Sequence, residues 1–183
     1  MKLIIDAGHG PNTDGKRTPD GKMKEFDFNE AVSQFIKKEL TGFGVIVINS
    51  HVKERDVPLK ERTTLANKMG VDAFISLHAN AYGTTWNNVS GIETYTYTKP
   101  SEQSLILASL IQNSLCSLTG RPNRGVKKAD FAVVRDTRMP AVLVECGFMT
   151  NKNEAMLLQS IDYRMRCAKA IAFAILCWIE QKR

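Results

Sequence analysis

The chain has 183 residues, of which 43% are hydrophobic and 24% charged, a balance that argues against a disordered chain. We expect one domain spanning residues 1–183, because this length allows a full hydrophobic core. The net charge of +6 favours an anionic partner such as cell wall, membrane surface or nucleic acid, but no nucleic-acid-binding motif supports the last.

Apolar runs and helical spacings alternate along the chain, which predicts an α/β fold. Short runs rich in β-branched residues predict strands at residues 3–7, 45–48, 73–78, 91–97, 131–134 and 141–145. Apolar residues at helical spacing predict helices at residues 28–40, 58–69, 101–118, 152–159 and 161–180. We therefore expect a mostly parallel, twisted sheet of about six strands, flanked by helices on both faces.

Two boundary signals add detail. Asp27 followed by Glu30 forms a capping-box pattern, so we expect Asp27 to be the N-cap of the first helix. No apolar stretch approaches the roughly 18–20 residues of a membrane span. The first residues become polar too quickly for a signal peptide.

Three of the predicted strands lead into residues that can bind a metal or move a proton. His9 follows the first strand, and His78 and Glu145 end the strands at 73–78 and 141–145. Ligands of open α/β sheets bind outside the carboxyl ends of the strands, so these side chains should meet at one rim. Two of only three histidines stand at such ends, and a strand-end carboxylate is costly to bury unless it is paired or useful. The pattern predicts a metal-dependent hydrolytic site.

A catalytic zinc ion usually has three protein ligands and leaves the fourth position to water. His9 and His78 would supply two of them, and Glu25 fits best as the third, because it ends the long loop after the first strand. Its competitors are the other acidic residues of this region, namely Asp6, Asp14, Asp20 and Asp27. Asp27 is better explained as a helix cap, and Asp6 as a possible hydrogen-bond partner of a metal-binding imidazole.

The third histidine and the cysteines fit structural roles better. His51 follows the second predicted strand and could also approach the rim, but its polar flank at residues 52–55 favours a surface position. The four cysteines form no C-x-x-C pair, and Cys116, Cys167 and Cys177 fall in predicted helices. Cys146 is the candidate nucleophile of a rival hypothesis, a cysteine hydrolase. Strand alternation turns it to the face opposite Glu145, which argues against that hypothesis.

Four stretches stand in order along the chain: IDAGHG at residues 5–10, KEFDFN at 24–29, ISLHANA at 75–81 and VLVECGFMTN at 142–151. Together they resemble the zinc-dependent N-acetylmuramoyl-L-alanine amidases of the amidase-3 family, the bacterial and phage cell-wall hydrolases. Supporting matches are LKER at 59–62, GIETY at 91–95 and NRGV at 123–126. The resemblance spans nearly the whole chain. It departs at residues 10–13, where many members carry a second glycine.

The resemblance implies one zinc ion held by His9, Glu25 and His78, with Glu145 as the catalytic acid and base. It implies hydrolysis of the amide bond between N-acetylmuramic acid and the L-alanine of the stem peptide, with peptidoglycan as the partner. The role would be that of an endolysin, or of an autolysin or sporulation lysin. The chain would be made in the cytoplasm and reach the wall after phage or mother-cell lysis, unless a leader is absent from the sequence. A non-catalytic wall-binding module is the remaining alternative, but it would not need Glu145.

We expect Asn80, Trp86 and Arg124 to contact the substrate. Asn80 and Trp86 belong to the polar segment 79–90, whose 12 residues are rich in Asn, Thr and Gly. This segment is too short to span two strands and also form a helix of about 11–12 residues over the metal. We therefore expect a monomer that is active without an activator protein and inserts into no membrane.

Overall fold

The computed structural model describes residues 1–182. Within this range one sheet has the strands β1 (Lys2–Ala7), β2 (Ile46–Asn49), β3 (Ala73–Asn80), β4 (Ile92–Thr96), β5 (Asn123–Lys128) and β6 (Ala141–Phe148). Their order is β2-β1-β3-β6-β4-β5. The β4–β6 pair is antiparallel, and the other neighbouring strands are parallel. This sheet confirms the predicted fold class.

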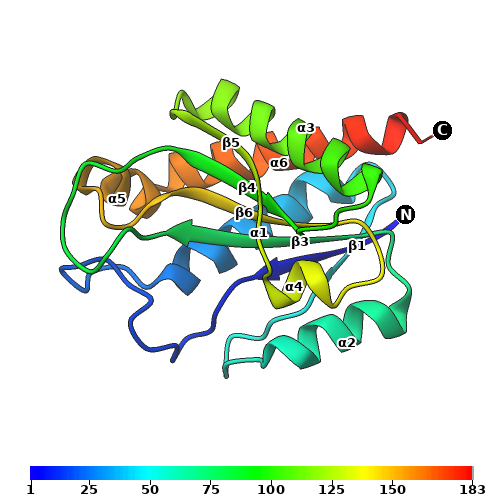
Figure 1. Ribbon diagram of the computed structural model, residues 1–183, viewed down its shortest axis with the longest axis horizontal. Coiled ribbons are helices and arrows are strands. Elements are labelled where there is room, and N and C mark those ends of the chain that lie inside the picture. The colour runs from blue at the N-terminus through cyan, green and yellow to red at the C-terminus, as the bar shows by residue number, and fades with distance from the viewer. Residues whose placement is uncertain (183) are drawn as a thin grey trace.

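Helices cover both faces of the sheet (Figure 1). They are α1 (Glu25–Thr41), α2 (Leu59–Met69), α3 (Glu102–Thr119), α4 (Ala132–Arg135), α5 (Lys152–Gln159) and α6 (Ile161–Glu180). α1, α3, α5 and α6 contribute to one apolar cluster, whereas α2 and α4 contribute to a smaller one on the opposite face. None of the helices within residues 1–182 has both the length and the apolar character needed to cross a membrane.

Strand alternation divides the core between the two faces. Leu3 and Ile5 belong to the larger cluster, and Ile4 and Phe74 to the smaller. The central strands β1, β3 and β6 are therefore buried on both faces, which explains why they appear as nearly continuous apolar runs in the sequence. Their polar residues are concentrated toward the carboxyl ends, where a ligand site is expected in such a sheet.

One predicted strand is wrong and one observed strand was missed. Residues 132–134 belong to the single helical turn α4, and its Val133 and Val134 are buried in the smaller cluster. A short apolar run does not distinguish the two structures by its pattern alone. The missed strand β5 contains Arg124, Lys127 and Lys128, and it pairs only with β4 at the edge of the sheet. Charged side chains are common on edge strands, and they hide the apolar pattern.

The predicted N-cap of the first helix is also wrong. α1 begins at Glu25 with Lys24 as the N-cap, and the Asp27 carboxylate accepts the Lys24 backbone N–H at 3.2 Å. Asp27 is therefore the third residue of the helix. The correction places Glu25 in the first helical turn, where the helix dipole favours a carboxylate.

Candidate metal centre

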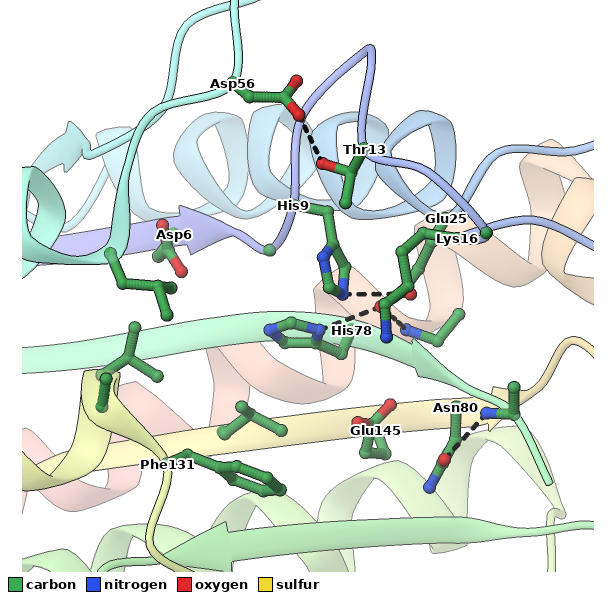
Figure 2. Close-up of a pocket in the computed structure, with 18 of the residues that line it drawn as sticks. Asp6, His9, Thr13, Lys16, Glu25, Asp56, His78, Asn80, Phe131 and Glu145 are labelled. Atoms are coloured by element: carbon green, nitrogen blue, oxygen red, sulfur yellow. Dashed lines mark hydrogen bonds and ion pairs between the residues drawn. The ribbon is translucent and has the colours of Figure 1, made fainter. Parts of the chain in front are cut away.

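Three side chains from distant parts of the chain converge in Figure 2. His9 follows β1, Glu25 begins α1, and His78 lies in β3. Nε2 of His9 is 3.2 Å from one oxygen of Glu25, and Nδ1 of His78 is 2.9 Å from the other. One nitrogen or oxygen atom from each residue lies within 4.8 Å of the other two. The structure thus brings together the three residues that the sequence singled out as metal ligands.

The backbone around Gly8 makes this convergence possible. Its N–H donates to the Leu77 carbonyl at 2.9 Å, which extends the parallel pairing of β1 with β3. A Cβ atom on Gly8 would lie 2.1 Å from Cε1 of His78, so the imidazole packs where only glycine leaves room. Within residues 1–182, His9 is the one non-glycine residue with a positive φ, 62°. That conformation costs an ordinary residue about 1–2 kcal/mol, which the surrounding contacts must offset.

The charges of the cluster are strongly coupled. Glu25 is only 3% exposed, and burial alone would raise its pKa. Hydrogen bonds and attraction from His78 and His9 outweigh burial, so the pKa of Glu25 lies well below its ordinary value. Burial lowers the pKa of His78. The hydrogen bond and the negative charge of Glu25 raise it by more than burial lowers it, so the pKa of His78 lies above its ordinary value. Two imidazoles and an ionised carboxylate form a donor set that suits zinc.

Glu145 lies one strand away from this donor set. It pairs with His78 in the β3–β6 register and lines the same cavity. Its Oε2 is buried and has no hydrogen-bond partner within residues 1–182. Burial, together with the negative charges of Glu25 and Glu93, raises the pKa of Glu145 to about 8 against the opposing effect of His78. A carboxyl with a raised pKa and one buried, unpaired oxygen is suited to accept and return a proton.

The cavity has a volume of about 770 Å³ and extends beyond the metal-binding cluster. Asn80, which the sequence predicts to contact the substrate, lines the cavity, and so does Lys16 (Figure 2). At the end near α2 and α4, the lining is apolar and includes Leu59, Phe131 and Leu143. Neither Lys16, in the loop after β1, nor Phe131, at the start of the apolar run 131–134 that predicts a strand, has a local sequence pattern that points to a ligand.

Trp86 and Arg124 lie outside the lining of this cavity. Trp86 is half-buried, and the Lys152 ammonium lies 6.0 Å from the centre of its ring. The Arg124 guanidinium donates to the Glu93 carboxylate, which also accepts from Lys127 at 2.9 Å. The prediction that Trp86 and Arg124 contact the substrate therefore remains untested, because neither residue lines this cavity.

Each competitor for the third ligand position is placed elsewhere. Asp14 lines the cavity but lies outside the cluster, and Asp20 accepts the Thr18 hydroxyl at 2.7 Å. Asp6 is paired with Arg62 at 2.7 Å. The Asp27 carboxylate accepts the Lys24 backbone N–H in the first turn of α1.

The predicted surface position of His51 is wrong. The side chain is buried, and its Nδ1 accepts the Ala7 backbone N–H at 3.0 Å. The polar residues that follow it misled the prediction, because burial here depends on β1 and α1. In contrast, Cys146 lies in the larger apolar cluster while Glu145 lines the cavity, which confirms that the two side chains occupy opposite faces of β6.

A family model described as N-acetylmuramoyl-L-alanine amidase, Amidase_3, matches residues 3–177. The chain is 36% identical over 180 residues to the uncharacterized protein YqiI of Bacillus subtilis, a match that covers 98% of this chain and 85% of YqiI. It is 34% identical over 170 residues to N-acetylmuramoyl-L-alanine amidase LytC of Bacillus subtilis. That match covers 92% of this chain but 34% of LytC, so the chain corresponds to about a third of that relative.

Solved structures agree with the sequence comparisons. An N-acetylmuramoyl-L-alanine amidase from Clostridium difficile 630 has a TM-score of 0.94 and 30% identity, covering 100% of this chain and 98% of that one. The CwlD amidase from Clostridioides difficile, solved in complex with the GerS lipoprotein, has a TM-score of 0.90 and 26% identity, with 98% of both chains covered. Because the family model matches almost the whole sequence and the fold agrees, this chain belongs to the Amidase_3 family of N-acetylmuramoyl-L-alanine amidases.

Proposed function

We propose that this chain is a zinc-dependent peptidoglycan amidase in which His9, Glu25 and His78 hold the metal and Glu145 transfers the proton. The enzyme class is that of its family, which hydrolyses the amide bond between N-acetylmuramic acid and L-alanine. The observation that carries the residue assignment is that three donor side chains line one cavity with Glu145, whose Oε2 is buried and unpartnered within residues 1–182. The chain would form one catalytic domain and degrade cell walls as an endolysin, autolysin or sporulation lysin.

The donor set supports zinc because two imidazole nitrogens and one carboxylate oxygen leave a fourth position open. A zinc ion held there would make water nucleophilic at neutral pH and polarise the substrate carbonyl. Glu145 then accepts a proton as water attacks the lactyl carbonyl carbon. It returns that proton to the L-alanine nitrogen as the C–N bond breaks, which releases a carboxylic acid and a free amine.

Hydrolysis of purified peptidoglycan tests this function directly. The protein should release new amino-terminal alanine from sacculi, because the bond that breaks is the one to the alanine nitrogen. EDTA should abolish the release and added zinc should restore it, whereas a thiol-blocking reagent should leave it intact because Cys146 is buried in the core. The measurement is end-group analysis of the soluble products with time.

Other outcomes of this experiment would contradict the proposal. Release of new reducing sugar ends in place of alanine would identify a glycosidase. Release of alanine that survives EDTA but stops after thiol modification would favour a cysteine hydrolase. Binding to sacculi without any cleavage would favour a wall-binding module.

We propose that the enzyme is an active monomer without a protein activator. The segment between β3 and β4, residues 81–91, contains no helix, so this segment provides no helical cover for the histidines. The related CwlD is described in complex with a lipoprotein, so independence from a partner needs its own test. The rate per enzyme molecule should stay constant over a wide range of enzyme concentration, and light scattering should give the mass of one chain. A rate per molecule that rises with concentration, or with a second protein, would contradict this expectation.

A further inference from the structure

A buried polar network lies directly beneath His9 and His78, and the proposed chemistry does not use it. Its central members are Asp6, Arg62 and Ser76, whose exposed fractions are 1%, 2% and 0%. Polar side chains this deeply buried are costly unless their hydrogen bonds are satisfied. Arg62, in particular, comes from α2, on the opposite side of the sheet from α1 and Glu25. The hydrogen bonds of Arg62, Asp6 and Ser76 show which backbone and side-chain groups this network holds in place.

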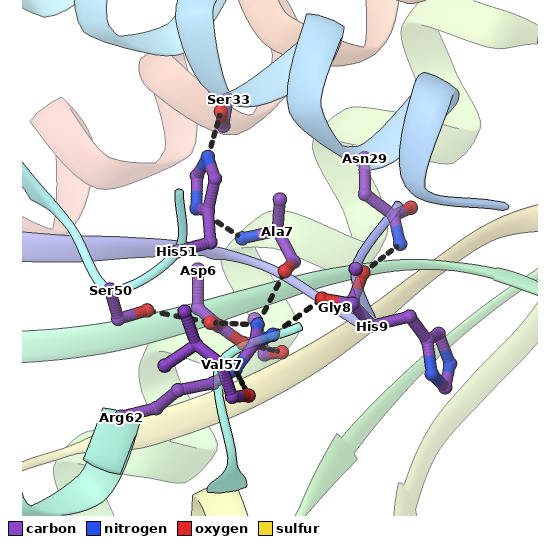
Figure 3. Close-up of polar contacts among 12 residues, drawn as sticks. Asp6, Ala7, Gly8, His9, Asn29, Ser33, Ser50, His51, Val57 and Arg62 are labelled. Atoms are coloured by element: carbon purple, nitrogen blue, oxygen red, sulfur yellow. Dashed lines mark hydrogen bonds and ion pairs between the residues drawn. The ribbon is translucent and has the colours of Figure 1, made fainter. Parts of the chain in front are cut away.

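Arg62 binds the backbone that carries His9 (Figure 3). Its Nη1 donates to the Ala7 carbonyl at 2.5 Å, and its Nη2 donates to the His9 carbonyl. Nη1 also donates to Oδ1 of Asp6 at 2.7 Å, and Nε donates to the Val57 carbonyl at 2.9 Å. The guanidinium thus holds the carbonyl group of Ala7, the last residue of β1, and that of His9 in the turn that follows. These bonds offset the unfavourable left-handed backbone of His9.

An ionised Asp6 carboxylate accepts hydrogen bonds and cannot donate any. Burial raises its pKa, but the charge of Arg62 and three hydrogen bonds outweigh burial and lower it overall. Oδ1 accepts the Ser50 hydroxyl at 2.6 Å in addition to Arg62, and Oδ2 accepts the Ser76 hydroxyl at 2.6 Å. The single hydroxyl hydrogen of Ser76 is therefore directed at Asp6.

The direction of the Ser76 hydroxyl hydrogen determines whether Ser76 donates to His78 or accepts from it. Oγ of Ser76 lies 3.1 Å from Nε2 of His78, and with its own hydrogen directed at Asp6 it can only accept. Nε2 of His78 therefore carries the hydrogen. In a neutral imidazole the lone pair is then on Nδ1, the nitrogen that faces Glu25 at 2.9 Å. The three donor atoms of the cluster consequently face one another.

We propose that Arg62, Asp6 and Ser76 are positioning residues of the metal site, and that they fix His78 as the tautomer that binds metal through Nδ1. This inference rests on the proposed function, because it concerns how His78 and His9 present their nitrogens to zinc. His9 faces Glu25 through Nε2, so the two histidines would bind metal through different ring nitrogens. Hydrogen-bond partners of this kind orient a ligating imidazole and increase its affinity for metal.

Nitrogen NMR of the zinc-loaded wild-type protein tests the tautomer without any substitution. Long-range ¹H–¹⁵N spectra should show His78 with a protonated Nε2 and a zinc-bound Nδ1, and His9 with a zinc-bound Nε2. His51 serves as the internal reference, because it lies outside the donor cluster. A zinc-bound Nε2 on His78 would overturn the inference while leaving zinc binding itself intact.

The variant Ser76→Ala tests whether the network affects affinity. It removes the hydroxyl between Asp6 and His78, and zinc affinity measured against a competing chelator should fall by about 10–100-fold. The matched control is Thr94→Val, which removes another fully buried hydroxyl, one that donates to Gln112 at 2.8 Å and does not touch the metal cluster. The control should keep wild-type affinity even if its thermal unfolding temperature falls as much as that of Ser76→Ala.

Each result of the affinity measurement is decisive. Wild-type affinity in a folded Ser76→Ala protein, or equal losses in both variants, would show that the hydroxyl has only a general structural role. If Ser76→Ala does not fold, the NMR measurement on the wild-type protein decides the question. A wild-type protein that binds no zinc would overturn both this inference and the proposed function, whereas the other failures leave the function standing.

Discussion

Replacing Glu145 with glutamine is expected to slow hydrolysis of peptidoglycan by roughly 10²–10⁴-fold, the range for loss of a general acid and base. Glutamine keeps the size of the side chain but cannot accept the proton from water. The substitution leaves the three proposed ligands in place, so about one zinc ion per chain should remain bound. Turnover and zinc content should be measured on the same preparation, so that chemistry and metal binding are separated.

The stability of this variant gives a second, independent readout. Oε2 of Glu145 is buried and lacks a hydrogen-bond partner within residues 1–182. Removing the ionisable group should therefore not lower the temperature of thermal unfolding, because no hydrogen bond to that oxygen is lost. The neighbouring Cys146→Ala is the matched control, since it alters the opposite face of β6 and should keep hydrolysis near the wild-type rate. Wild-type turnover in Glu145→Gln would assign the proton transfer to another group.

The arrangement of the candidate site could be predicted because it depends on simple properties of a parallel sheet. Strands buried on both faces are continuous apolar runs, so the residues just beyond their cores are easy to locate. His78 and Glu145 were expected at the strand ends, yet β3 and β6 continue to Asn80 and Phe148. The rim was correctly located even though the boundaries were two or three residues short. The chemical roles of these residues stay predictions.

Other features depend on partners that are distant in the sequence. Arg62 looks like an ordinary charged residue of a helix, and only the fold directs its guanidinium to Asp6, 56 residues earlier. His51 is buried because β1 and α1 pass over it, which its polar neighbours in the sequence do not indicate. The basic strand β5 was not predicted either, because only its pairing with β4 identifies it as a strand.

Replacing either proposed histidine ligand is expected to remove metal and activity together. A zinc site with one ligand missing retains two protein donors, so the affinity of His9→Ala or His78→Ala should fall by more than the roughly 10–100-fold expected when a hydrogen-bond partner is lost. Zinc content after dialysis and release of alanine from sacculi are the two measurements. The third histidine provides the control, since His51→Gln should still bind about one zinc ion per chain.

The His9 position needs a further variant, because its φ of 62° is unfavourable for alanine as well as for histidine. His9→Asn tolerates the left-handed backbone better and still lacks the imidazole, so it separates loss of a ligand from backbone strain. If the imidazole is the ligand, His9→Asn should lose zinc as completely as His9→Ala while unfolding at a higher temperature. Full zinc occupancy in His9→Asn and in His78→Ala would rule out this ligand set, and Asp14 would be the next carboxylate to test because it lines the same cavity.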